Sequence, residues 1–285
     1  MILVTGATGY TGSFLLPRLL AWNQPLRCLV RPTSDQSLLA SQPVEVYTGD
    51  LEDPASLAPA MEGVELVFHL AHIRHTPALL AAAPPTVQRL VLVSSQRRYS
   101  QVPPPSVAEV IAGEQSAFAS PLPWVLLRPT MIYGPGEDRN LSRLASYLRR
   151  RPWIPVCGPG RALQQPVHVE DLVGALMAAA RCPAALRRAY DLGGPEALNY
   201  NDLVDQLGLA LGVRPRKVHL PLPLVLGALW VAGLAGIKTG LEAEQFRRLQ
   251  EHKHCAIDAA QRDLGFAPRP LAEGLAQIHR QEAAR

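Results

Sequence analysis

The chain of 285 residues is long enough to bury a substantial core, and its 48% hydrophobic and 18% charged residues are typical of an ordinary folded protein. The formal net charge of +4 comes from scattered residues, without a basic run interleaved with aromatic side chains, so we expect no nucleic-acid partner. Four well-separated cysteines without a C-x-x-C pair argue against zinc-knuckle and dithiol redox motifs and favour free thiols in a reducing cytoplasm.

Apolar strands alternate with helices along the first half of the chain. Met1 runs directly into the first predicted strand without a basic leader, which favours cytoplasmic localisation. This alternation predicts an α/β fold of the Rossmann type, a doubly wound parallel sheet covered on both faces. We expect strands over residues 1–6, 25–31, 44–50, 64–71, 87–95 and 124–134, and helices over 12–22 and 56–63.

After Gly134 the pattern becomes irregular and rich in proline. Helices are expected over residues 140–150, 169–180 and 200–212. The natural division is a nucleotide-binding domain of residues 1–133 and about 164–190, beside a smaller substrate-binding region of residues 134–163 and 191–285.

Residues 220–237 form an uncharged segment at the lower length limit for a membrane span. Two prolines and three glycines weaken that interpretation. We expect a helix that is buried in the protein or lies at an oligomer interface, with membrane contact as the less favoured alternative. The oligomeric state is left open between monomer and homodimer.

The strongest chemical signal is VTGATGYTG, which lies between a buried strand and an amphipathic helix. Gly6 permits the tight turn, Gly9 lets the backbone approach a pyrophosphate, and Gly12 allows the helix to pack closely on the strand. The helix N-terminus offers unpaired N–H groups to the phosphates. We therefore expect a dinucleotide site that also includes the intervening residues Ala7, Thr8, Tyr10 and Thr11.

The end of the second strand bears on the choice of cofactor. An acidic residue there would accept hydrogen bonds from the ribose, whereas Arg31 would pair with a 2′-phosphate. NADP is therefore favoured over NAD. NAD is the alternative because Asp35 lies close in sequence, and Arg31 could equally be a solvated surface charge.

Six motifs carry a resemblance to a known family. The chain resembles the extended short-chain dehydrogenase/reductases, in particular the NAD-dependent epimerase/dehydratase proteins and their atypical, NmrA-like relatives. The motifs occur in the order seen in that family: TGATGYTG, GDLED at 49–53, VFHLA at 67–71, VLVSS at 91–95, LLRPTMIYGPG at 126–136 and VHVEDLVGAL at 167–176.

The resemblance implies a cofactor site beyond the glycine loop. It places Asp50, with Leu51, near the adenine, and Leu70 and Ala71, followed by His72, beside the adenosine and pyrophosphate. Ser94 would line the nicotinamide end. Residues that would border the nicotinamide and open the substrate region are Pro129, Thr130 and Ile132.

The expected catalytic residues depart from the family pattern. Active members use a serine or threonine to orient the substrate, a tyrosine to exchange a proton, and a lysine four residues later. Ser95 matches the first position, but Ser106 stands where the tyrosine belongs and Val110 where the lysine belongs. Moreover, the sequence contains no lysine before Lys217.

Tyr99 is the remaining phenol beside Ser95. We hypothesise that it donates the proton, with Arg97 or Arg98 favouring its phenolate by charge proximity. The alternative is that both arginines are solvated and Tyr99 packs on its loop. Ser106 could still bind the ribose or the substrate.

Other polar clusters predict less. His69, His72 and His75 do not share one face, so no metal site is expected, although His72 or His75 could lie near the substrate. In related proteins the residues matching Glu170 and Asp171 seat a helix, and N-capping by Asp171 explains them.

Three functions remain open. The first is an NADPH-dependent reductase of a small carbonyl, quinone or other unsaturated compound. The second is a non-catalytic NADP-binding sensor or scaffold, and the third is a nucleotide-sugar epimerase or dehydratase.

Overall fold

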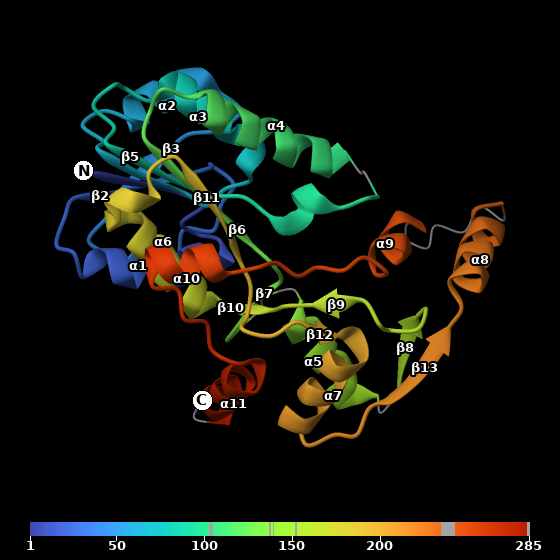
Figure 1. The fold of residues 1–285 in the computed structure, drawn as a ribbon. Coiled ribbons are helices and arrows are strands. Elements are labelled where there is room, and N and C mark those ends of the chain that lie inside the picture. The colour runs from blue at the N-terminus through green and yellow to red at the C-terminus, as the bar shows by residue number, and fades with distance from the viewer. Residues whose placement is uncertain (103–104, 137, 139, 152, 235–242, 284–285) are drawn as a thin grey trace.

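The computed structural model describes residues 1–102, 105–136, 138, 140–151, 153–234 and 243–283. Its centre is a seven-stranded, all-parallel sheet with the order β11-β6-β5-β4-β1-β2-β3 (Figure 1). The strands are β1 (Ile2–Thr5), β2 (Leu26–Val30), β3 (Glu45–Thr48), β4 (Leu66–His69), β5 (Arg89–Val93), β6 (Trp124–Pro129) and β11 (Arg188–Leu192). The order reverses between β1 and β4, which is the switch point where such sheets bind ligands. The predicted Rossmann-type fold is confirmed.

Helices cover both faces of this sheet. In Figure 1, α2 (Pro54–Ala60), α3 (Thr76–Ala82) and α4 (Pro105–Ala119) lie on one face, and α1 (Tyr10–Leu20), α6 (Val169–Arg181) and α10 (Asp258–Leu264) lie on the other. Ile2 and Val4 of β1 belong to the core beneath α1 and α6, whereas Leu3 belongs to the opposite core. Burial on both faces explains why the strands are continuous apolar runs rather than alternating ones.

The predicted strand 124–134 is broken in two. β6 ends at Pro129, and β7 (Ile132–Tyr133) pairs with β10 (Val167–His168) in a separate small sheet. Proline lacks the amide hydrogen that a central strand needs to continue its ladder. The chain therefore leaves the main sheet after Pro129 and crosses its carboxyl edge.

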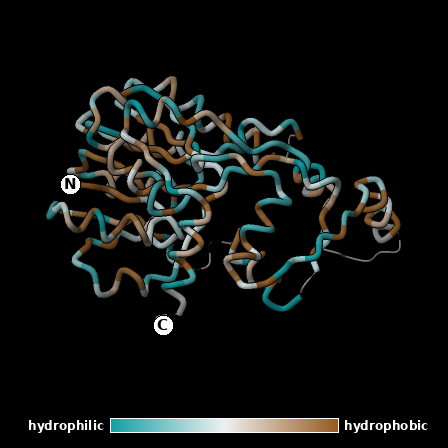
Figure 2. The backbone as a smooth tube through the Cα atoms, turned by 60° about the horizontal axis from the view of Figure 1, so that its bottom comes forward, coloured by the Kyte–Doolittle hydropathy of each residue, from teal (hydrophilic) through white to brown (hydrophobic). Residues whose placement is uncertain are grey.

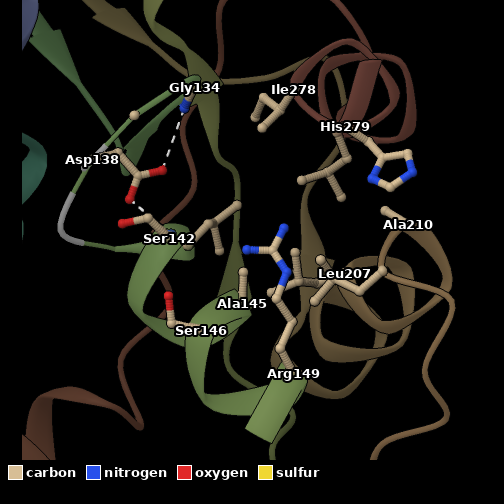
Figure 3. Close-up of a pocket in the computed structure, with 14 residues that line it drawn as sticks. Gly134, Asp138, Ser142, Ala145, Ser146, Arg149, Leu207, Ala210, Ile278 and His279 are labelled. Carbon is tan, nitrogen blue, oxygen red and sulfur yellow. Dashed lines mark hydrogen bonds between the residues drawn. The ribbon is translucent and has the colours of Figure 1, made fainter. Parts of the chain in front are cut away.

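A second layer of helices and short strands has its own core. β8 (Trp153–Cys157) pairs with β13 (Arg216–Leu220), and β9 (Leu163–Gln164) pairs with β12 (Leu198–Asn199). The core beside them is shared by α5 (Leu141–Arg150), α7 (Tyr200–Ala210) and α11 (Leu271–Ala283). A cavity of about 280 Å³ lies among these three helices; Leu207 and Ile278 line it, and the side chains of Asp138, Arg149 and His279 stand around it (Figure 3).

The proposed division of the chain needs one adjustment. The four residues Ile257, Ala260, Leu264 and Phe266 pack into the core beneath α1 and α6, on the nucleotide-binding sheet. We therefore keep the two-part division as a proposal, with residues 257–266 assigned to the larger part.

The described part of the apolar segment, residues 220–234, does not form a buried helix, and residues 235–237 lie outside the described residues. Most of that part is α8 (Leu222–Leu234), in which Leu224 and Trp230 are each 68% exposed. Helix α8 lies at the right edge of the molecule in Figure 1, and much of the tube at that edge is brown, the hydrophobic colour, in Figure 2. The expectation of burial is wrong, while the interface alternative stays a prediction. Within the described ranges, no helix is long and apolar enough to cross a membrane.

Two helical glycines provide a matched test of the packing. A Cβ on Gly113 of α4 would lie 2.2 Å from the carbonyl oxygen of Ile73, whereas one on Gly174 of α6 would meet nothing within 4 Å. Gly113→Ala should therefore destabilise the protein by about 1–3 kcal/mol despite its better helix propensity. Gly174→Ala should stabilise it by up to about 1 kcal/mol. Urea unfolding of both variants measures this, and an equal gain in stability for both would contradict the close α4 contact.

Candidate functional site

The glycine loop between β1 and α1 is shaped by three different constraints. Gly6 has φ +74°, and a Cβ there would lie 2.9 Å from the backbone nitrogen of Ala71. A Cβ on Gly12 would lie 2.4 Å from the carbonyl oxygen of Gly6. A Cβ on Gly9 would meet only that carbonyl oxygen, at 3.2 Å. Gly6 and Gly12 are thus required by the fold, while Gly9 keeps the outer surface of the loop open to a ligand.

The N-terminus of α1 fits a dinucleotide pyrophosphate. No side chain caps the helix at Gly9, and its first turn contains no acidic residue. The first N–H groups of a helix lack partners within the helix and carry partial positive charge, which suits an anion. The loop and helix end are therefore residues that could hold the phosphates of a dinucleotide.

One groove, of about 420 Å³, lies between the glycine loop and the end of β2; we call it the Arg31 groove. Ser34 and Arg74 also line it, and so do His72 and His75. The predicted cofactor residues that line it are Gly6, Thr8, Gly9, Arg31, Asp50, Leu51, Leu70, Ala71 and His72.

The other groove, of about 460 Å³, lies between the glycine loop, the segment that crosses from β6 to β7, and the end of β5; we call it the Ser95 groove. Thr130 is fixed there because its hydroxyl donates to the carbonyl of Gln165. The predicted residues that line it are Gly6, Gly9, Tyr10, Thr11, Gly12, Leu70, Ser95, Pro129, Thr130 and Ile132.

Four predicted residues are not among those that line the two grooves. Ala7 is buried in the core, and Ser106 is half-buried in the first turn of α4. Ser94 is buried, and its hydroxyl donates to Glu114 at 2.5 Å. Ser94 therefore supports the site from beneath and does not line it as the resemblance implied. Tyr99 is the fourth.

Glu114 of α4 is the centre of a buried ionic cluster. Its carboxylate is fully buried and accepts two hydrogen bonds of 2.8 Å from Arg128, as well as bonds from Arg98 and Ser94. Such a charge is tolerated in the interior only when it is paired and its lone pairs are satisfied. The cluster joins α4, β6 and η2 (Gln96–Tyr99), the single turn that follows Ser95.

Tyr99 belongs to the edge of this cluster. Its hydroxyl accepts from Arg128 at 3.3 Å and donates to Asp191 at 3.2 Å. Burial, followed by the Asp191 carboxylate, raises the pKa of Tyr99, and this outweighs the opposite effect of Arg128 and Arg98. Arg98 does favour the phenolate by charge proximity, as hypothesised, but its effect is too small to lower the pKa of Tyr99 below the ordinary value.

The C-terminal segment contributes site residues that the sequence did not indicate. Arg248, Glu251 and Lys253 line the Ser95 groove together with Arg97. Arg248 ends α9 (Ala243–Arg248), and the other two follow it. The one signal in the sequence was that lysine is rare, with only three in the chain, of which Lys253 is one. Nothing local in the sequence links residue 253 to residue 95.

Glu170 and Asp171 act differently from the prediction. The residue that caps α6 is His168, whose Nδ1 accepts from the backbone N–H of Glu170 at 3.3 Å. Asp171 instead accepts from the guanidinium of Arg269, including its Nε at 2.9 Å. N-capping by Asp171 is therefore wrong, and the pair seats α6 by binding the segment before α11. In the described part of the chain, no group of three or more His, Cys, Asp or Glu residues could hold a metal.

Comparison with known proteins agrees with this geometry. Residues 6–144 match the NAD(P)H-binding family model, and residues 106–193 match the model of the NAD dependent epimerase/dehydratase family. A ceramide reductase from Caulobacter vibrioides is 28% identical over 80% of this chain and 76% of its own length. The (4-alkanoyl-5-oxo-2,5-dihydrofuran-3-yl)methyl phosphate reductase of Streptomyces griseus is 31% identical over 76% of each chain.

Solved structures share the whole fold. The crystal structure of gox2253 superimposes with a TM-score of 0.79 and 26% identity, over 99% of this chain and 98% of the other. The central sheet, the glycine loop and these likenesses lead to one conclusion. The chain belongs to the NAD-dependent epimerase/dehydratase family of extended short-chain dehydrogenase/reductases and carries an NAD(P)-binding domain.

Proposed function

We propose that the protein is an NADPH-dependent reductase of a small carbonyl or other unsaturated compound. The observation that carries this proposal is the Ser95 groove, in which one space is bounded by the glycine loop, by Ser95 and by Thr130 to Ile132. A cofactor on the loop would share that space with a small substrate. The reductase names of the two relatives support the same reaction class.

The hydroxyl of Ser95 can offer a proton to a substrate. Its Oγ accepts the backbone N–H of Arg97 at 3.1 Å, and among the described residues no acceptor takes its hydroxyl hydrogen. A reduced nicotinamide, when bound, supplies the hydride. The hydroxyl of Ser95 would donate to the substrate oxygen and hold the carbonyl in place as negative charge develops there.

We propose Tyr99 as the proton donor. Its raised pKa keeps the phenol protonated at neutral pH, so the proton is available. Tyr99 does not line the Ser95 groove, so transfer to a substrate there requires its hydroxyl to leave Asp191 and turn toward the groove, while Arg128 would stabilise the charge that remains on the oxygen. Ser106, in the first turn of α4, is a far poorer acid than a phenol, so we assign it to the support of that helix.

The Arg31 groove favours NADP over NAD. Arg31 and Ser34 line it at the end of β2, where a 2′-phosphate would lie. Asp35 does not line this groove, and its carboxylate accepts the backbone N–H of Ser37 at 2.9 Å. Asp35 is thus turned to its own loop, which removes the main argument for NAD.

A non-catalytic NADP-binding sensor is the second candidate. The observation that favours it is the side chain of Val110, which is 1% exposed and packs in the core where the family's lysine would stand. Epimerisation ranks third because it needs the missing tyrosine. A cytoplasmic location is part of the proposal and fits the four free cysteines.

The glycine loop can be tested without disturbing the fold. Because a side chain at Gly9 meets little of the protein, Gly9→Val should fold normally yet block the approach of the pyrophosphate. We expect NADP(H) affinity to fall by roughly tenfold or more, with an unchanged melting temperature. Calorimetric titration of a folded Gly9→Val protein that binds NADP(H) as tightly as the wild type would remove the site assignment.

Cofactor preference depends on Arg31. Arg31→Ala should weaken NADPH binding by about 1.5–3 kcal/mol, the cost of a lost charged hydrogen bond, and leave NADH affinity almost unchanged. Arg18→Ala is the matched control, because Arg18 lies in the last turn of α1, far along the helix from the glycine loop. It should alter the affinity for neither NADPH nor NADH. Equal weakening of both cofactors by Arg31→Ala, or a wild-type preference for NADH, would contradict this choice.

Turnover tests the assignment of the acid. Tyr99→Phe should lower kcat by roughly 10²- to 10⁴-fold and leave NADPH affinity intact, and Ser95→Ala should cost less. Stopped-flow measurement of NADPH oxidation with a carbonyl panel provides both values. Full activity of Tyr99→Phe would contradict Tyr99 as the proton donor and would point to a group that lines the Ser95 groove. If no carbonyl compound is reduced by the wild type, the sensor function is favoured.

A further inference from the structure

Three cationic side chains converge on the Ser95 groove from two distant parts of the chain. Arg97 comes from η2, whereas Arg248 and Lys253 come from the segment beyond residue 243. None of the three belongs to the glycine loop, and the reaction proposed above uses none of their side chains.

The three charges are close enough to affect one another. Burial and then the charge of Arg248 lower the pKa of Arg97, against the opposing effect of Glu244. Burial, Arg248 and Arg97 likewise lower the pKa of Lys253, against the opposing effect of Glu251. Like charges held together without compensation are costly, so their arrangement favours a negative group between them.

Protein carboxylates satisfy little of this charge. Glu251 is already occupied, because it accepts bonds from the hydroxyl of Ser100 and from the backbone N–H groups of Gln101 and Val102, at 2.7–2.9 Å. Glu244 approaches Arg248 only to 4.0 Å. Across the residues that the structure describes, no side chain accepts a hydrogen bond from Arg97 or Lys253, and the Nε atom of Arg248 is buried without a partner.

We propose that Arg97, Arg248 and Lys253 form an oxyanion subsite that binds a carboxylate or phosphate group of the substrate, beside the carbonyl that Ser95 orients. The subsite rests on the proposed reductase function and narrows its substrate to anionic carbonyl compounds. Guanidinium groups suit both oxyanions because they donate in a planar fork, and Lys253 adds a point charge. Glu251 positions the subsite, since its bonds to residues 100–102 fasten the C-terminal segment beside η2.

The cofactor pyrophosphate is the competing occupant, and the experiment separates the two. NADP⁺-saturated protein is titrated by calorimetry with mandelate, with phenyl phosphate, and with the uncharged methyl mandelate. We expect at least one anion to bind roughly tenfold more tightly than the ester, with an advantage that falls as salt rises. The stronger of the two anions identifies the group as carboxylate or phosphate.

Neutral variants locate the effect. Arg248→Gln and Lys253→Gln should each abolish most of the preference for the anion and leave NADP⁺ affinity within about twofold of the wild type. Arg247→Gln is the matched control, because Arg247 is exposed on the same helix and is not among the residues that line the groove. It should retain the full preference.

Several results would overturn the subsite. One is equal binding of anion and ester, and another is no anion binding at all. The third is a loss of NADP⁺ affinity in Arg248→Gln or Lys253→Gln, which would show that these side chains bind the cofactor. The reductase proposal fails separately. If mandelate binds through these residues but phenylglyoxylate is never reduced, the subsite stands without the reaction. If methyl phenylglyoxylate is reduced as readily as phenylglyoxylate, the reaction stands without the subsite.

Discussion

The buried carboxylate of Glu114 is the interaction on which the site depends. A fully buried charge costs several kcal/mol unless other groups replace its hydration. Here two arginines and a serine do so, and they come from three other segments of the chain. The cluster thereby fixes the carboxyl ends of β5 and β6 and the turn η2 against α4. Arg97 stands on that turn and Ser95 caps its start, so the positions of both follow from a charge that is itself fully buried.

The same helix carries Ser106 and Val110, the two positions at which the resemblance places the family's usual catalytic pair. Glu114 lies one helical turn after Val110, and both side chains are buried. With valine in place of lysine, this part of α4 packs as ordinary core instead of reaching toward a ribose. In our proposal the helix therefore supports the fold, and the cofactor is bound by backbone groups of the glycine loop and by the residues at its two sides.

Local patterns predicted most of the fold. The apolar runs separated by helices were sufficient to predict the parallel sheet, because strands buried on both faces leave a continuous signature. The break after Pro129 followed from the missing amide hydrogen and could have been predicted from that residue alone. Whether α8 is buried or exposed could not be predicted, because an apolar run gives the composition of a helix and does not show which residues cover it. The exposed Trp230 makes that difference plain.

For the candidate site too, residues that act within one short segment could be predicted, and residues brought together from distant segments could not. The glycine loop and Arg31 could be predicted because each function depends on residues within one βα unit. The polar residues that line the Ser95 groove from the C-terminal segment could not be predicted, since Glu251 and its partner Ser100 are 151 positions apart in the sequence. One consequence is that the two ends of the site are built by different parts of the chain. In our proposal the cofactor end depends on the central sheet, whereas two of the three cationic side chains that face the substrate, Arg248 and Lys253, come from the end of α9 and the residues after it. Substitutions in that segment are therefore expected to change which substrate is bound while the dinucleotide site stays intact.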